Sequence, residues 1–232
     1  MNDNQLVIGT TFPVDNERDK FIHNIALRSA INAAVQTRSH DHPVFSRLVV
    51  IDKTADSKEE RVEKYNRKLE VTSFWKNILQ KHAIYYCVEQ RDSSFFIRDV
   101  YNLQNEINEK YWSFFEGGSI RIAQCQKSLA VYLKWLWCWG KCPYELPVCP
   151  IDRQVLSHCY RNELSRDLKK DNYWRRLIVR INQEGGWGQI NNMKDYSDLV
   201  EMTISVADRH GEHVAPWELR VFNDVVLDDV SE

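Results

Sequence analysis

The most apolar segment of the chain, residues 119–140, constrains the fold more than any other feature of the sequence. It reads SIRIAQCQKSLAVYLKWLWCWG, a helical pattern with Ser119 in position to cap its start and Gly140 to end it. A helix that is apolar on most of its faces must be covered by other parts of the protein. We therefore expect this helix to lie at the centre of the fold.

Helical patterns also dominate the rest of the chain. The clearest predicts a first helix at about residues 17–37, capped by Asp15 or Asn16. Further helices are predicted at residues 59–68, 74–90, 91–118 (in two pieces), 151–168, 195–211 and 216–226. Together these patterns predict an all-α, multi-helix globular fold of about eight to ten helices around the central apolar helix.

Two boundaries in the first half of the chain need separate interpretation. Thr72 or Ser73 is expected to cap the helix at residues 74–90 and so to separate it from the exposed helix before it. Residues 39–53 contain a proline and then the apolar run Leu48–Ile51. This stretch could form a short strand, a buried loop or a helix start, and the sequence leaves the three open.

Length and composition favour a single globular unit. With 232 residues, 43% of them apolar, the chain can bury a sizeable core. We expect one helical domain over residues 1–232, or two closely packed helical lobes. No run approaches the roughly 20 apolar residues that span a bilayer, and the N-terminus lacks a secretory pattern. A cytoplasmic protein that enters no membrane is expected, with its six cysteines as reduced thiols.

The spacing of the cysteines does not favour a metal centre. Cys138, Cys142 and Cys149 are followed by His158 and Cys159, and only the first two cysteines are as close as paired zinc ligands usually are. The chain also lacks a P-loop lysine motif, a nucleophile elbow and a zinc-protease His pair. We therefore expect no metal and no cofactor, and nucleotide hydrolysis and the common hydrolase mechanisms are disfavoured.

The net charge of −2 hides a strong segregation of charge along the sequence. Residues 153–180 carry eight basic and three acidic side chains, whereas residues 194–232 carry three basic and ten acidic ones. The first segment predicts a cationic face for phosphates, and the second an acidic layer that a protein partner could contact. The alternative for both is a set of solvated helix faces.

Two short motifs flank the second half of the central helix. The run KSLA lies at residues 127–130 and the run PIDRQV at residues 150–155. Together they resemble the helix-hairpin-helix DNA glycosylase superfamily, in which a hairpin leads into a helix opening with a Lys-Thr-Ala-like run and then to a Pro-Val-Asp turn. The resemblance covers residues 117–161 and is closest in layout to the archaeal 8-oxoguanine glycosylase branch. Residues 122–126 stand where the family carries its hairpin glycines.

The resemblance implies a catalytic site. It places Asp152 on the catalytic aspartate and Lys127 on the lysine that is the nucleophile in bifunctional members. An ionised carboxylate can stabilise the positive charge that glycosidic cleavage builds on the sugar, and a neutral amine can attack the anomeric carbon to form a Schiff base. A flipped base also needs aromatic stacking partners, and DNA phosphates need cations. The candidates are Trp139, Trp112 and Phe115 for the base pocket, and Arg153, Arg121, Lys134 and Arg161 for contacts with DNA.

The leading functional hypothesis is a DNA glycosylase that excises a damaged or modified base from double-stranded DNA, in repair or in defence against phage with modified DNA. Strand cleavage at the abasic site would accompany a lysine nucleophile. The alternative is a non-catalytic helical adaptor, or a DNA-binding subunit of a bacterial multi-protein system. In that case Asp152 opens a helix, Lys127 is an exposed helical lysine, and the aromatic side chains belong to the core.

Overall fold

The computed structural model describes residues 16–36 and 43–228. Eight α-helices lie within these ranges, and the only extended pairing there is an isolated bridge between Phe45 and Phe115. The all-α fold class and the expected number of helices are therefore confirmed for the described residues. None of these helices is both long enough and apolar enough to cross a membrane.

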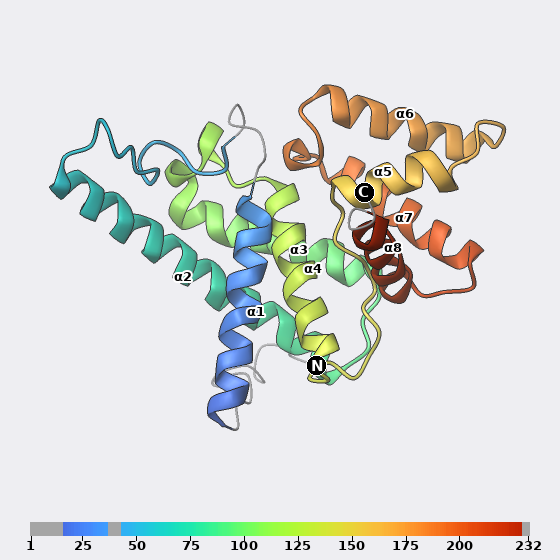
Figure 1. Cartoon of the computed structure of the whole chain (residues 1–232), viewed down its shortest axis with the longest axis horizontal. Coiled ribbons are helices and arrows are strands. Elements are labelled where there is room, and N and C mark those ends of the chain that lie inside the picture. Colours follow the sequence, from blue (N-terminus) through green and yellow to red (C-terminus); the bar gives the residue numbers. More distant parts are fainter. Residues whose placement is uncertain (1–15, 37–42, 229–232) are drawn as a thin grey trace.

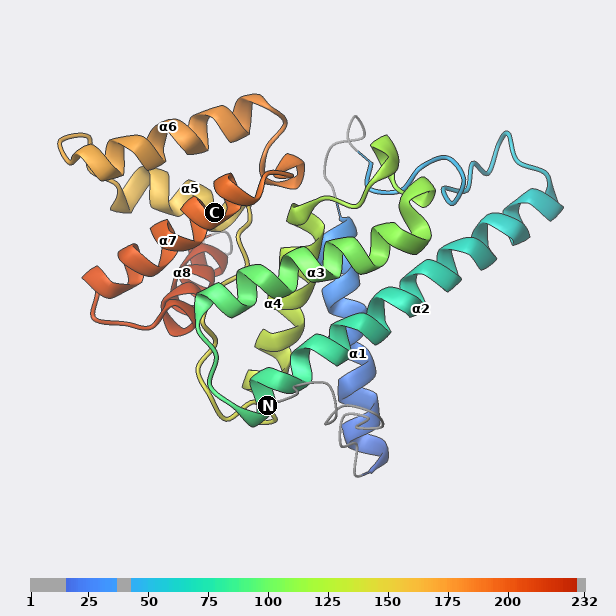
Figure 2. The same cartoon turned by 180° about the vertical axis from the view of Figure 1, so that it is seen from behind.

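The helices follow one another in the order shown in Figure 1, with the longest connections between α1 and α2 and between α4 and α5. They are α1 (Glu17–Val35), α2 (Lys58–Val88), α3 (Ser93–Tyr111), α4 (Ile122–Cys138), α5 (Arg153–His158), α6 (Lys169–Gln183), α7 (Met193–Arg209) and α8 (Val214–Asp228). A π-helical turn, Cys159–Glu163, continues α5. Figures 1 and 2 show α1–α4 gathered on one side of the molecule and α5–α8 on the other.

Helix α4 lies at the centre, as its apolar sequence predicts. It packs against α1, α2 and α3 and against the 3-10 turn Trp187–Gln189 that precedes α7. The helix begins at Ile122 rather than just after Ser119, since Arg121 is the extended N-cap residue, and the Ile120 N–H is bonded to the Asn108 side chain of α3 (2.9 Å). Gly140 ends it with a φ of 78°, a conformation that glycine adopts without strain.

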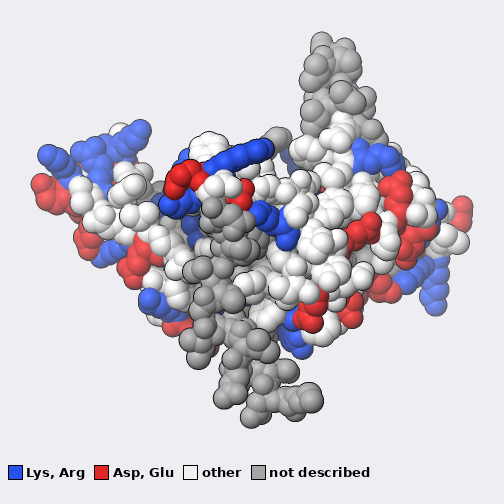
Figure 3. Space-filling model, turned by 90° about the horizontal axis from the view of Figure 1, so that it is seen from below, with Lys and Arg blue, Asp and Glu red and all other residues white. Residues whose placement is uncertain are grey.

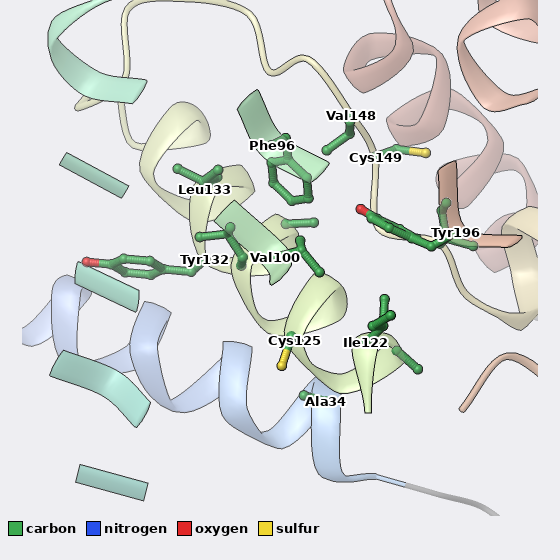
Figure 4. Close-up of a cluster of buried hydrophobic side chains, with 14 of the residues drawn as sticks. Ala34, Phe96, Val100, Ile122, Cys125, Tyr132, Leu133, Val148, Cys149 and Tyr196 are labelled. Atoms are coloured by element: carbon green, nitrogen blue, oxygen red, sulfur yellow. The ribbon is translucent and has the colours of Figure 1, made fainter. Parts of the chain in front are cut away.

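One continuous core joins the two groups of helices (Figure 4). Val100 of α3 and Leu133 of α4 are fully buried on the α1–α4 side. Cys149 of the connection between α4 and α5 and Tyr196 of α7 belong to the same buried cluster. Because α7 packs against both α3 and the π-helical turn that continues α5, it ties α5 to the α1–α4 side.

Helix α2 corrects one prediction from the sequence. The expected break at Thr72 or Ser73 is wrong, since a single helix runs from Lys58 to Val88. The Thr72 hydroxyl donates to the Lys68 carbonyl (2.8 Å) within the same helix, so it does not cap a new one. The N-terminal cap is Ser57, which forms a reciprocal capping box with Glu60. At α1, Asn16 caps the helix as expected.

The open question at residues 39–53 is answered for the part from Pro43 onward, which is irregular. Residues 37–42 lie outside the described residues. The N–H groups of Val49 and Val50 both donate to the Ser46 carbonyl (3.1 and 3.2 Å), so this backbone closes a turn on itself. A strand at Leu48–Ile51 is therefore absent from this described segment.

Candidate functional site

The two residues singled out by the motifs meet in the structure. Lys127, on the second turn of α4, forms an ion pair through its Nζ with Oδ2 of Asp152, at the start of α5. The Lys127 side chain is 12% exposed and that of Asp152 is 16% exposed. The pair is therefore largely desolvated but reachable from solvent, a setting that strengthens electrostatic interactions relative to water.

The carboxylate of Asp152 divides its two oxygens between two tasks. Oδ1 accepts hydrogen bonds from the backbone N–H groups of Gln154 and Val155 (2.9 and 3.0 Å) and so caps α5. Oδ2 faces Lys127. Because the cap fixes the side chain in one rotamer, the charge of Asp152 is oriented before any ligand arrives.

A buried glutamine joins the two motifs. The Gln126 side chain, fully buried beside Lys127, donates to the carbonyl of Ile151 (2.7 Å) and accepts from its N–H (3.1 Å). These two bonds satisfy both backbone groups of the residue preceding Asp152. The Gln126–Ile151 contact therefore sets the register between α4 and α5 that brings Lys127 to Asp152.

Trp187 supplies an aromatic surface beside the ion pair. Its ring centroid lies 5.7 Å from the Nζ of Lys127, within the range of a cation–π contact. The 3-10 turn Trp187–Gln189 is attached to the start of α4, where the Ala123 N–H donates to the Ile190 carbonyl (2.9 Å) and the Gln124 side chain to the Gly188 carbonyl (3.2 Å). Trp187 is half-buried. Neither Trp187 nor Gln126 was a candidate from the sequence.

The three aromatic residues expected in the base pocket do not surround the pair. Phe115 is 1% exposed and packs in the core, with its ring 5.6 Å from that of Phe45, so it is a core residue rather than a stacking surface. Trp139 caps the far end of α4, about 18 Å along the helix from Lys127. Trp112 is exposed in the connection between α3 and α4.

The four cations expected at DNA have different environments. Lys134 is paired with both carboxylate oxygens of the buried Glu218 (2.9 and 2.8 Å), a contact that joins α4 to α8. Arg121 occupies the N-cap position of α4, where partial burial lowers the pKa of its guanidinium. Arg153 and Arg161 are exposed, and neither forms an ion pair with the described residues.

Part of the charge that is segregated along the sequence is neutralised in space. Cations of the basic segment pair with carboxylates of α7, as in Lys170–Glu201 and Arg180–Asp195, both at 2.7 Å. On the face in Figure 3, basic and acidic side chains alternate in small groups. Five exposed cations of the basic segment have no hydrogen bond or ion pair with the described part of the chain. They are Arg153, Arg161, Arg166, Lys169 and Arg176.

Two hollows of the described surface are lined by residues other than the ion pair. One of about 500 Å³ is lined by residues such as Arg91 and Glu145, and one of about 360 Å³ lies beside Tyr160. Neither is lined by Lys127 or Asp152. Within residues 16–36 and 43–228, no three His, Cys, Asp or Glu side chains are grouped so as to hold a metal ion.

Comparison of the chain with protein-family models, with curated proteins and with solved structures gave no significant match. The geometry of Lys127, Asp152, Gln126 and Trp187 is therefore the basis for a functional interpretation.

Proposed function

We propose that the protein is a DNA glycosylase that removes a damaged or modified base from double-stranded DNA. The observation that carries this proposal is the ion pair between Lys127 and Asp152, which joins the two motifs across 25 residues of sequence. An amine and a carboxylate are the two groups that a lysine-dependent glycosylase requires. Their partial burial and the Gln126–Ile151 contact give them a fixed mutual geometry.

Lys127 is assigned as the nucleophile. Once its ammonium has lost a proton, Nζ can form a bond to the anomeric carbon while the bond from that carbon to the base breaks. The electron pair of the broken bond leaves with the base, which takes up a proton. Opening of the sugar ring then gives an imine between Lys127 and the sugar, and this intermediate allows cleavage of the strand.

Asp152 is assigned two roles around this step. While Oδ2 contacts Lys127, the carboxylate is placed to accept the proton of the ammonium. The carboxylate passes this proton on to solvent before the glycosidic bond stretches, so that its negative charge can stabilise the cationic character of the sugar. The cap of α5 holds Oδ1 throughout, so little reorganisation is needed.

Trp187 and the exposed cations fit the needs of a DNA substrate. An extruded base loses its stacking partners, and the half-buried ring of Trp187, in cation–π contact with Lys127, offers an aromatic surface for it. The exposed Arg153 adjoins Asp152 and is the nearest of the five exposed cations in sequence. We assign it to a phosphate next to the target nucleotide.

The direct test is incubation of the protein with a panel of duplexes, each carrying one modified base, followed by alkali to cleave abasic sites. Wild-type protein is expected to release at least one base, and Asp152→Asn to release none at a comparable rate. Glu201→Gln is the matched control, because it neutralises a carboxylate of an exposed pair remote in sequence from the motifs. Equal activity in wild type and Asp152→Asn would reject the proposal.

A second candidate function is a DNA-binding subunit without catalysis. It is supported by the five exposed cations, which could contact phosphates whether or not chemistry follows. Under this alternative the Lys127–Asp152 pair only joins α4 to α5. DNA binding without base release from any duplex in the panel would favour it.

A further inference from the structure

Two cysteines meet at the other end of α4 from Lys127. Cys87 lies in the last turn of α2, and Cys142 follows the end of α4. Their Sγ atoms are 2.6 Å apart, and both are free thiols. Cys87 is half-buried and Cys142 is buried. Two thiols at this separation need only a small displacement to form a covalent bond.

The backbone holds this contact in place. After Gly140 reverses the chain, the N–H groups of Lys141 and Cys142 both donate to the Leu136 carbonyl (2.9 and 3.3 Å). On the other side, the Glu89 N–H donates to the Tyr85 carbonyl (3.1 Å) and ends α2 just beyond Cys87. The thiol pair is therefore positioned by two helix ends, which meet in the lower part of Figure 2.

We propose that Cys87 and Cys142 are a modification site that forms a reversible disulfide on exposure to hydrogen peroxide. The Cys87 thiolate attacks one peroxide oxygen, the O–O bond breaks, and a sulfenic acid and hydroxide result. The Cys142 sulfur then attacks the Cys87 sulfur and displaces the sulfenic oxygen. In total, two thiols and one peroxide give one disulfide and two water molecules. A dithiol reductant reverses the modification.

The order of these steps follows from the environments of the two sulfurs. A hydrogen bond from the Cys142 thiol lowers the pKa of Cys87, although burial opposes this effect. The same contact and burial raise the pKa of Cys142. Since the thiolate is the reactive form and Cys87 is the more exposed of the two, Cys87 reacts first.

The other four cysteines lack one of these features. Cys125, Cys149 and Cys159 are buried, and burial raises the pKa of each thiol. Cys138 is exposed, and no sulfur contact is recorded for it among the described residues. The proposed disulfide is therefore selective for one pair, and Cys138 is a natural control.

The cross-link changes a measurable property of the whole protein. It joins positions 55 residues apart and encloses α3 and α4, so it restricts the unfolded chain more than the folded one. For a loop and a protein of this size, Tm should rise by roughly 10 °C. The inference does not depend on the proposed glycosylase activity, because Lys127 lies at the opposite end of α4.

The experiment treats the full chain with a slight excess of hydrogen peroxide and then alkylates the remaining thiols. Peptide mapping should identify a Cys87–Cys142 cross-link, with four thiols still alkylated out of six and all six recovered after dithiothreitol. Thermal unfolding should show the rise in Tm only in the oxidised protein.

Two variants make the test specific. Cys87→Ser should lose both the cross-link and the rise in Tm, whereas Cys138→Ser should retain both. Because Cys87 is only half-buried, its serine variant is expected to fold, which the Tm of the reduced form will verify. Six alkylated thiols after peroxide, or a cross-link that survives in folded Cys87→Ser, would overturn the proposal.

Discussion

Replacing Gln126 with methionine tests whether this buried side chain fixes the geometry of the site. Methionine has a similar volume but cannot form either bond with Ile151. Both backbone groups of the fully buried Ile151 would then lose the partners that they have in the structure. A buried polar group left without a partner costs about 1–3 kcal/mol. We therefore expect Gln126→Met to lower the free energy of unfolding by about 2–6 kcal/mol.

Gln124 provides a matched control on the same helix. It is equally buried, but its side chain donates a single hydrogen bond, to the Gly188 carbonyl (3.2 Å), and its Oε1 has no partner among the described residues. Gln124→Met removes one hydrogen bond but also removes a buried acceptor that has no partner, and the second change offsets part of the first. The free energy of unfolding should therefore fall by only about 1 kcal/mol. The two variants change the same chemical group in neighbouring turns of α4.

Urea unfolding at pH 7, followed by circular dichroism, measures both free energies. The unfolding slope with urea should be unchanged if each variant retains the native fold. Base release should also fall more in Gln126→Met than in Gln124→Met, because the first loosens the Lys127–Asp152 contact, whereas the second removes one of the two hydrogen bonds that attach the Trp187 turn to α4. Equal destabilisation by the two variants, or a loss below 1 kcal/mol in Gln126→Met, would refute this reasoning.

Three further predictions concern charge. Asp152→Asn should lower base release by about 10²–10³-fold while keeping the cap of α5, since asparagine also caps helices, although the loss of the ion pair with Lys127 should lower the free energy of unfolding. Single-turnover kinetics would measure the loss of base release, and a loss below 10-fold would contradict the assigned role. DNA affinity, measured by fluorescence titration, should fall roughly 10²–10³-fold between 50 and 200 mM salt. Lys169→Ala should make this dependence of affinity on salt less steep than Lys170→Ala does, because Lys170 is already paired with Glu201. Burial disfavours the charged form of His82, but two neighbouring carboxylates outweigh burial and raise the pKa of its imidazole above its usual 6.5. The stability that the imidazolium charge contributes is therefore full below pH 6.5 and is lost as pH rises through the raised pKa. In urea unfolding, the free energy of unfolding of the wild type relative to His82→Gln should decline toward alkaline pH. A difference between the two proteins that does not change with pH would contradict this prediction.

The fold was largely predictable because its determinants are local. The apolar pattern of residues 119–140 identified the central helix, and Gly140 its end. The break expected at Thr72 was wrong because a hydroxyl can bond to the preceding turn of its own helix as well as cap a new one. Which of these occurs depends on packing, since Val71 and Trp75 are fully buried in a continuous α2.

The site was predictable only where a motif marked it. Lys127 and Asp152 were selected from two motifs, and the fold brings them into contact. Gln126 and Trp187 join the candidate site through contacts with residues distant in the sequence, which no local pattern encodes. The glycines around Trp187 indicate a tight turn, but they do not indicate which other segment this turn contacts. Phe115 illustrates the reverse error, because composition does not separate a core aromatic from a surface one.

The most direct test of the central claim is trapping of the covalent intermediate. Wild-type protein is incubated with a duplex whose modified base it releases, in the presence of borohydride, which reduces an imine to a stable amine. The account predicts a protein–DNA adduct that peptide mapping assigns to Lys127 and that Lys127→Ala does not form. An adduct at another lysine, or base release at the wild-type rate by folded Lys127→Ala, would contradict it.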